Sequence, residues 1–408
     1  MEEAIKFTLR VFSALKHRNF RLFWFGQLIS LIGSWMQIVA QGWLVLKLTN
    51  SPFYLGLVGA LAGLPVLIFS LFAGVIADRL NKRLILVFTQ ITMMLLAFVL
   101  SYLVGSGIVK VWHVIILASF MGVAAAFDTP TRQSFVVEMV GKEDLMNAIA
   151  LNSSIFNGAR VIGPAIAGIL ISKMGLEGCF LVNGISFIPV IIGLLMIRTS
   201  YDGKEKKSGT VWEDIREGLS YIKHDKTVSA MITLVATTSI CIMPYAVLMP
   251  AFARDILHTD AHGFGILMSS VGLGALFGAL SLAAMGNFKR KGLIVSAGNA
   301  VLPLAVIAFS FTRNFHLGIV FLMIIGWAII SQNATINTLL QSMVPDHLRG
   351  RVMSVYVLMF MGMMPIGSFI GGFAAQYLGV PHAILVGGIV FLFVAIITMV
   401  KVPQIQRL

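Results

Sequence analysis

Charged side chains are scarce in this chain. Only 12% of its 408 residues are Asp, Glu, Lys or Arg, whereas 58% are hydrophobic and the mean hydropathy is +0.92. A water-soluble globular chain has about 25% charged residues. Most of the protein surface must therefore face hydrocarbon, which excludes an ordinary soluble fold.

Cysteine is nearly absent, and so are the sequence patterns of enzymes. The two cysteines, Cys179 and Cys241, have neither metal-site nor disulfide spacing. The chain has no Walker motif, zinc-ligand spacing or nucleophile elbow, and its eight histidines are scattered. We expect no metal, no cofactor and no enzymatic activity, and an ion gradient rather than ATP as the energy source. A membrane-embedded enzyme or receptor is the least favoured alternative.

Acidic residues are few, which leaves a formal net charge of +13. Nucleic-acid binding would need the basic residues on one soluble face. Here they stand in short runs between apolar stretches, as in a protein that spans a lipid bilayer. We therefore expect lipid, and no nucleic acid, as a partner.

Long apolar runs dominate the sequence. A helix needs about 20 mostly apolar residues to span a membrane. Twelve runs meet this criterion, so we expect an all-α membrane protein with twelve transmembrane helices and both termini on one side. The runs are 20–47, 52–77, 84–105, 111–136, 146–172, 178–197, 228–250, 262–286, 292–312, 315–341, 350–376 and 381–400.

The basic residues predict the orientation of these helices. With the N-terminus in the cytoplasm, 24 of the 30 Lys and Arg residues fall on the cytoplasmic side, five fall outside, and Arg160 lies within a helix. Cytoplasmic loops carry this excess in membrane proteins. We expect a multi-pass membrane protein with both termini in the cytoplasm.

One long hydrophilic stretch divides the chain. It separates an N-terminal half (1–198) from a C-terminal half (227–408). Within this linker (199–226), Trp212, Ile215, Leu219 and Ile222 follow the period of an amphipathic helix. We interpret it as a linker on the cytoplasmic surface, in preference to a regulatory site.

The two halves repeat each other. Leu48 through Leu84 align with Leu257 through Leu293 at a shift of 209 residues. Four glycines (Gly122, Gly163, Gly168 and Gly175) and Val140 align with their counterparts at a shift of 204. Since each half holds six predicted spans, both copies run in the same direction. Transporters use parallel halves of this kind for alternating access, with the substrate near the midplane between them. The repeat therefore favours transport over passive anchoring.

The loop after the second run carries a recognisable motif. Residues 74–83 read GVIADRLNKR, with Gly74, Asp78, Arg79 and Arg83 in the register of the signature loop of the major facilitator superfamily. The chain resembles that superfamily, whose fold is two pseudo-symmetric six-helix bundles. Asn81 replaces the usual glycine, and asparagine is a common substitute at a left-handed turn.

The resemblance implies a role for this loop. Asp78 is expected to cap the eleventh helix near Leu348, and Arg79 and Arg83 to complete an ionic latch that favours the outward-open state. A basic loop that only sets topology is the alternative.

Two further helices extend the resemblance. Gly122, Ala126, Pro130 and Glu138 fit the second superfamily motif, but Ala118 stands where that motif has an intramembrane arginine linked to proton coupling. The fifth run resembles the antiporter motif of exporters. Its members are Gly158, Arg160, Gly163, Pro164 and Gly168. Close helix packing is the structural alternative for these small residues.

Two local strings resemble one branch of the superfamily. Residues 127–135 (FDTPTRQSF) and 157–164 (NGARVIGP) are similar to enterobactin exporters, macrolide efflux pumps and lysophospholipid transporters. The resemblance implies a monomeric exporter of small amphipathic organic compounds, siderophore-like or drug-like, that works by rocker-switch proton antiport. A lysophospholipid flippase or an importer of the same fold is the alternative.

Few ionisable residues lie inside the predicted spans, and each is a functional candidate because burying charge in lipid is costly. Asp128 and Arg132 lie four residues apart on one helix face, as an ion pair or as a gate. Arg160 either binds an anionic substrate group or pairs with Asp128. If transport is proton-coupled, Asp128 is the best candidate for the proton-binding carboxylate.

The resemblance also assigns a substrate cavity to the first, fourth, seventh and tenth helices, with the eleventh nearby. An apolar cavity with scattered amides suits a bulky amphipathic solute. For each residue the alternative is helix packing. The candidate residues are Trp35, Gln37, Gln41, Tyr245, Gln332, Asn333, Asn337 and Tyr356.

Overall fold

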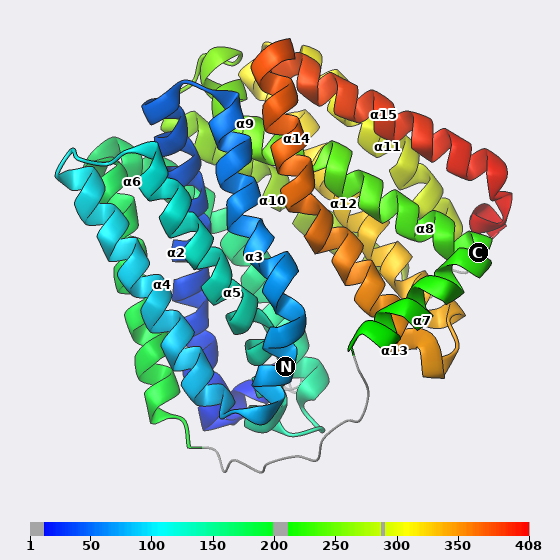
Figure 1. The fold of residues 1–408 in the computed structure, drawn as a ribbon, viewed down its shortest axis with the longest axis horizontal. Helices are drawn as coiled ribbons and strands as arrows, with labels where there is room; N and C mark the ends of the chain where they lie inside the picture. The colour runs from blue at the N-terminus through cyan, green and yellow to red at the C-terminus, as the bar shows by residue number, and fades with distance from the viewer. Residues whose placement is uncertain (1–11, 199–210, 287–289, 408) are drawn as a thin grey trace, which may run out of the picture. The chain divides into compact units, whose positions relative to one another are not determined.

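The computed structural model describes residues 12–198, 211–286 and 290–407, apart from the side chains of residues 70, 71, 74, 75, 77–79, 211–215 and 407. The described chain is helical throughout (Figure 1). Its long helices are α2 (Arg18–Thr49), α3 (Pro52–Arg79), α4 (Lys82–Gly105), α5 (Val111–Val140), α6 (Leu145–Met196), α10 (Ala261–Met285), α11 (Lys291–Phe311), α12 (Phe315–Met343) and α15 (Val380–Lys401).

Two further membrane-length helices contain a π-helical turn. The first is α8 (Lys226–Thr237), η2 (Thr238–Ile242) and α9 (Pro244–Asp255). The second is α13 (Asp346–Val357), η3 (Leu358–Gly362) and α14 (Met363–Leu378). Short π segments inside α-helices are frequent at functional sites.

Within the described ranges, eleven helices are long and apolar enough to cross a membrane. One of them, α6, is 52 residues long and has non-helical angles at Gly175 (φ 75°). At 1.5 Å per residue it would be about 78 Å long if straight, more than twice the bilayer core. The break at Gly175 falls between the predicted runs 146–172 and 178–197, and every other run matches one helix to within a few residues.

The chain divides into two compact units. Unit 1 comprises Met1–Gln41 and Ile68–Lys206, and unit 2 comprises Gly42–Leu67 and Lys207–Leu408. Residues 42–67, the end of α2 and the first part of α3, belong to unit 2, although the predicted N-terminal half (1–198) included them.

Repeat-related residues make the same packing contact in each unit. In unit 1, Gly184 of α6 lies against the ring of Phe98 on α4. In unit 2, Gly388 of α15 lies against Ile307 on α11. These glycines are 204 residues apart and their partners 209, which are the two shifts of the sequence repeat. The internal repeat thus extends from the sequence to the helix packing.

The linker helix α7 (Val211–His224) packs on α13 within unit 2. Gly218 and Ile222 are buried, and Glu217 pairs with Arg351 at 2.6 Å. Leu219 was predicted on the apolar face of this helix but is 45% exposed. Gly218 lies on the packed face instead, where the lack of a side chain lets α7 approach the backbone of Arg351 closely. The predicted Trp212 and Ile215 side chains lie outside the described part.

A short helix, η1 (Ser13–Lys16), is tied to the turn before α6 by Asp144. The Asp144 carboxylate lies 2.7 Å from Lys16 Nζ and 2.8 Å from His17 Nε2. Hydrogen bonds from Lys16, His17 and Ser13 hold the pKa of Asp144 well below its usual range. Because the folded-state pKa is lowered, the stabilisation is present above the ordinary aspartate pKa of about 3.9 and is lost as the pH falls below it.

Asp144→Asn is therefore expected to release η1 at neutral pH and to remove its acid sensitivity. Hydrogen exchange of the η1 amides, corrected for intrinsic pH dependence, should be several-fold faster in the variant at pH 7. The wild type should lose protection only in acid. Equal protection of both proteins at pH 7 would show that Asp144 does not hold this segment.

Candidate functional site

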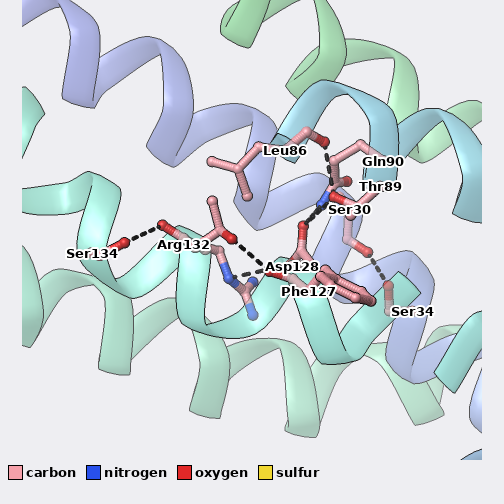
Figure 2. A network of polar contacts seen from close by, with 10 residues as sticks. Ser30, Ser34, Leu86, Thr89, Gln90, Phe127, Asp128, Arg132 and Ser134 are labelled. Carbon is pink, nitrogen blue, oxygen red and sulfur yellow. Dashed lines mark hydrogen bonds and ion pairs between the residues drawn. The ribbon is translucent and has the colours of Figure 1, made fainter. Parts of the chain in front are cut away.

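A buried carboxylate lies on α5 of unit 1. Asp128 is 4% exposed, and its Oδ1 accepts hydrogen bonds from Gln90 Nε2 at 2.8 Å and from Thr89 Oγ1 at 3.1 Å, both on α4 (Figure 2). Its Oδ2 lies 3.6 Å from Arg132 Nε, one helical turn along. We call Asp128, Thr89, Gln90 and Arg132 the Asp128 cluster.

The Asp128 cluster follows from the helix period. Residues at i and i+4 share a helix face, which brings Arg132 beside Asp128. The predicted local ion pair is therefore present, although 3.6 Å is longer than the 2.7–2.9 Å typical of strong N⁺–H···O⁻ bonds. The hydrogen bonds from α4 keep the carboxylate satisfied in its buried position.

Sequence reasoning missed the α4 members of this cluster. Thr89 and Gln90 lie inside a predicted apolar run, where a long amide is itself unusual and could have indicated a buried polar partner. Further polar atoms of unit 1 are buried without a hydrogen-bond partner in the described chain. They are Trp24 Nε1 and Gln27 Oε1 on α2, Gln90 Oε1, and Asn152 Oδ1 on α6.

Arg160 does not join the Asp128 cluster. In the described residues it has no ion pair, and its guanidinium lies 5.7 Å from the ring centroid of Trp35 on α2. Trp35 also meets Phe156 edge-on at 5.8 Å. The predicted pair with Asp128 is absent from this structure, because α6 directs Arg160 toward an aromatic ring.

The antiporter-motif glycines lie where α6 approaches α2. A β-carbon on Gly163 would lie 2.6 Å from Trp35 Cβ and 2.8 Å from the carbonyl oxygen of Ile32. Pro164 and Gly168 are buried within the helix, whereas no atom lies within 4 Å of a β-carbon placed on Gly158. Close packing accounts for Gly163, and Gly158 borders open space.

The signature loop is described only in part. Its residues Gly74, Asp78 and Arg79 are among those whose side-chain environment lies outside the described part. Arg83 donates from Nε to the carbonyl oxygen of Leu194 at 2.6 Å and from Nη2 to that of Leu195, near the end of α6. A cation there complements the negative end of the helix.

Asn81 does not adopt the left-handed turn that we predicted. Its φ is −64°, and its side chain caps α4 by accepting a hydrogen bond from the Leu84 amide. An N-cap needs a side-chain acceptor and extended backbone angles, and asparagine supplies both. Beside it, Lys82 pairs with Glu138 of α5 at 2.5 Å.

Two of the predicted cavity amides form hydrogen bonds to residues of their own unit. In unit 1, Gln37 is buried and accepts from Asn183 Nδ2 at 2.5 Å, whereas Gln41 is half-buried. In unit 2, Gln332 is fully buried and donates to Asn299 Oδ1 at 2.5 Å. These hydrogen bonds make Gln37 and Gln332 packing residues of their own units.

The other predicted cavity residues of unit 2 differ in their contacts. Asn333 is 6% exposed, and both polar atoms of its amide lack a partner in the described chain. The Tyr356 hydroxyl donates to the backbone carbonyl of Asn333 at 3.3 Å. Asn337, one turn further along α12, accepts from Gln341 at 2.6 Å. Tyr245 is buried on α9.

The two π segments pack against each other in unit 2. Ser239 of η2 is fully buried and donates to the carbonyl oxygen of Phe360 in η3 at 2.8 Å. A β-carbon on Gly367 would lie 2.6 Å from the carbonyl oxygen of Ser239. Gly367 is the repeat partner of Gly163, which makes the equivalent close approach to α2 in unit 1.

A second close contact in unit 2 joins α3 to α14. A β-carbon on Gly372 would lie 2.6 Å from the Cα of Gly56, and there is no space for one. We call this the α3–α14 contact. Elsewhere in unit 2, Trp43 of α2 stacks on Phe264 of α10 at 5.8 Å, and Arg254 of α9 donates to Asn50 Oδ1 at 2.6 Å.

The described residues contain no group of three or more His, Cys, Asp or Glu side chains that could hold a metal ion. The candidate functional groups among them are the buried carboxylate of Asp128, the guanidinium of Arg160 over Trp35, and the amide of Asn333.

A sequence profile of the transmembrane secretion effector family matches residues 10–408, nearly the whole chain. The chain belongs to this family. It is a membrane transporter of the major facilitator type, like its relatives. The staphyloferrin A transporter of Staphylococcus aureus is 25% identical over 90% of this chain and 92% of its own length.

Efflux proteins are similar over comparable lengths. Macrolide efflux protein A of Streptococcus pyogenes is 23% identical over 94% of this chain and 96% of its own. The multidrug efflux pump Tap of Mycolicibacterium fortuitum is 25% identical over 94% and 95%.

Solved transporter structures share the fold. The nucleoside transporter NupG gives a TM-score of 0.77 at 11% identity, covering 95% of this chain and 98% of that one. An inward-facing bacterial homologue of the human lysosomal transporter Spinster gives 0.75 at 15% identity, covering 96% and 98%. At such identities the likeness concerns the fold alone.

Proposed function

We propose that this chain is a secondary active transporter that exports small amphipathic organic compounds, siderophore-like or drug-like, in exchange for protons. It acts in the bacterial cytoplasmic membrane with both termini inside, and α6 crosses twice to complete twelve spans. The observation that carries the proposal is the buried carboxylate of Asp128 within a membrane-spanning helix. A buried ionisable group in a membrane is costly and marks a functional site.

The geometry at Thr89 suits a carboxyl group that gains and loses a proton. The Thr89 hydroxyl lies 3.1 Å from Asp128 Oδ1 and 3.0 Å from the carbonyl oxygen of Leu86 (Figure 2). Its single proton can serve only one of these acceptors fully at a time. With Asp128 ionised, Thr89 donates to the carboxylate. With Asp128 protonated, it donates to Leu86 and accepts from the carboxyl group.

The position of Arg132 depends on whether Asp128 carries a proton. A protonated Asp128 no longer attracts the guanidinium, whose distance of 3.6 Å already indicates a loose pair. Proton binding therefore frees a cation that is partly exposed, with 21% of its side-chain surface accessible. We propose that this release couples proton binding to alternating access.

Each unit by itself offers a candidate group for substrate binding, Asn333 in unit 2 and Arg160 in unit 1. The unpaired amide of Asn333, beside Tyr356, has an NH₂ group that can donate hydrogen bonds and a carbonyl oxygen that can accept them. Arg160, held over Trp35, offers a positive charge without a carboxylate partner in the described chain. An amphipathic compound with an anionic or carbonyl group matches this chemistry.

Alternating access requires a closed contact that opens. We propose that the α3–α14 contact is closed in this structure and separates when substrate is released outside. The backbone approach of Gly56 and Gly372 supports this role, because two apposed glycines let helices meet closely without interlocking side chains.

A compound panel tests the proposed function. Cells with and without the protein are exposed to staphyloferrin A, macrolide antibiotics and other toxic amphipathic compounds, the first two because relatives carry those names. We expect lower internal accumulation of at least one compound when the protein is present. Higher accumulation would indicate an importer, and selective movement of lysophospholipid across the bilayer a flippase.

Arg160→Ala is expected to lower transport of an anionic compound about tenfold, the order of a desolvated cation–π and charge interaction. Arg160→Lys keeps the charge but not the planar stacking, and is expected to recover part of the loss. Transport by each variant should be normalised to the amount of protein in the membrane. If Arg160→Ala is absent from the membrane, Arg160 is a packing residue.

A further inference from the structure

An apolar groove of about 590 Å³ lies on unit 1, and one of its lining residues, Thr89, also donates a hydrogen bond to Asp128. Its walls come from α3, α4 and α5, and include Phe88, Phe120 and Phe127. Ala124 contributes little volume between these rings. Of the lining residues, only Thr89 and Thr92 are polar.

The two threonines present little polarity to the groove. Thr92 Oγ1 donates to the carbonyl oxygen of Phe88, and Thr89 Oγ1 is engaged by Leu86 and Asp128. Hydroxyl groups satisfied in this way add no requirement for a polar ligand. The groove therefore selects hydrocarbon.

The groove opens on the lipid-facing side of its helices. Leu84 is 64% exposed and Phe88 is 73% exposed, although both lie in a membrane-spanning helix. The groove residues of α4 run from Leu84 to Thr92, about 3–15 Å from the start of the helix at Lys82. This depth is one leaflet of a bilayer whose hydrocarbon core is about 30 Å thick.

An ion pair lies two residues before Leu84, the first groove residue of α4. Lys82 and Ile85 share one face of α4, and Glu138 lies three turns from Phe127 on the same face of α5. The Lys82–Glu138 pair joins the two helices there, with 15% and 34% of the side chains exposed. An apolar slot that ends at a partly exposed ammonium group matches an acyl chain with a phosphate at its head.

We propose that this groove binds one acyl chain of a phospholipid, in the leaflet where α4 begins. The orientation of the basic residues assigns that leaflet to the cytoplasmic side. The chain lies between the rings of Phe88 and Phe120 and ends near Thr89, and the phosphate contacts Lys82. The proposal does not rest on the proposed function, although Thr89 belongs to both the groove and the Asp128 cluster.

Photolabelling tests the proposal directly. The full chain is reconstituted in phospholipid vesicles with a trace of phosphatidylcholine that carries a diazirine midway along one acyl chain. After illumination, adducts are mapped by mass spectrometry. Adducts per exposed area are expected to be about fivefold more frequent on groove residues of α4 and α5 than on the exposed face of α15 around Phe393, which corresponds to about 1 kcal/mol.

A matched pair of variants separates groove binding from general lipid contact. Val123→Trp fills the groove and is expected to reduce the groove adducts about fivefold. Ile116→Trp adds the same side chain at an exposed position of α5 outside the groove and is expected to leave them unchanged. Adducts that only follow exposed area in the wild type, or that persist in Val123→Trp, would overturn the proposal.

Discussion

Replacing Asp128 with asparagine is expected to reduce gradient-driven transport to the level of vesicles without the protein. Asparagine keeps the size of the side chain but cannot exchange a proton. Downhill exchange of substrate across the membrane should persist, because the substrate-binding groups are elsewhere. The measurement is accumulation of an identified substrate with and without an imposed pH gradient, at equal amounts of folded protein.

Glu138→Gln provides the matched control on the same helix. Glu138 pairs with Lys82 and is partly exposed, so the pair is expected to contribute about 1 kcal/mol or less to stability and nothing to coupling. If Asp128→Asn still concentrates substrate against its gradient, proton coupling does not pass through Asp128.

Gly372→Val is expected to produce the second-largest effect, a loss of transport of about tenfold or more. Its side chain would collide with the backbone of Gly56, and such overpacking costs about 1–3 kcal/mol. The cost falls only on the state in which the α3–α14 contact is closed, so the population shifts toward the opened state. Ser51→Cys, in a background without Cys179 and Cys241, should become more reactive to a membrane-impermeant thiol reagent added outside.

Gly350→Ala is the control for this substitution. No atom lies within 4 Å of a β-carbon at Gly350, so the variant should transport normally. Gly56→Val should reproduce the Gly372→Val defect, and the double variant should be less than additive because both changes open one contact. Normal transport by Gly372→Val would show that the contact is not part of the cycle.

Much of the fold could be predicted from the sequence because lipid imposes a simple rule. Every spanning segment must satisfy its own backbone, so a run of about 20 apolar residues becomes a helix. Gly175 shows what this rule leaves out. The sequence placed a gap there, but only the backbone angles explain how two spans join without a loop.

The candidate site was less predictable, since it depends on which helices meet. Asp128 and Arg132 are four residues apart, so their pairing follows from helix geometry alone. The hydrogen bonds from Thr89 and Gln90 require α4 to pack on α5 in one register, which no local pattern encodes. Arg160 failed as a partner for Asp128 for the same reason, since the direction of a side chain depends on the rotation of its helix.

The amide residues illustrate the difference between a cavity and a core. Gln332 and Asn333 are neighbours on α12, yet Gln332 is paired with Asn299 and Asn333 has no partner for its amide in the described chain. A sequence shows both as polar residues in an apolar run. Only the packing of α11 against α12 separates a structural amide from a candidate ligand of the substrate.

The most direct test of the transport proposal is the uptake of a compound found in the panel by inside-out vesicles, in which export appears as uptake. With the vesicle interior made more acidic than the medium, we expect accumulation above the external concentration, and collapse of the pH gradient should abolish it. Uptake that merely equilibrates, and is the same with and without the gradient, would contradict proton-driven export.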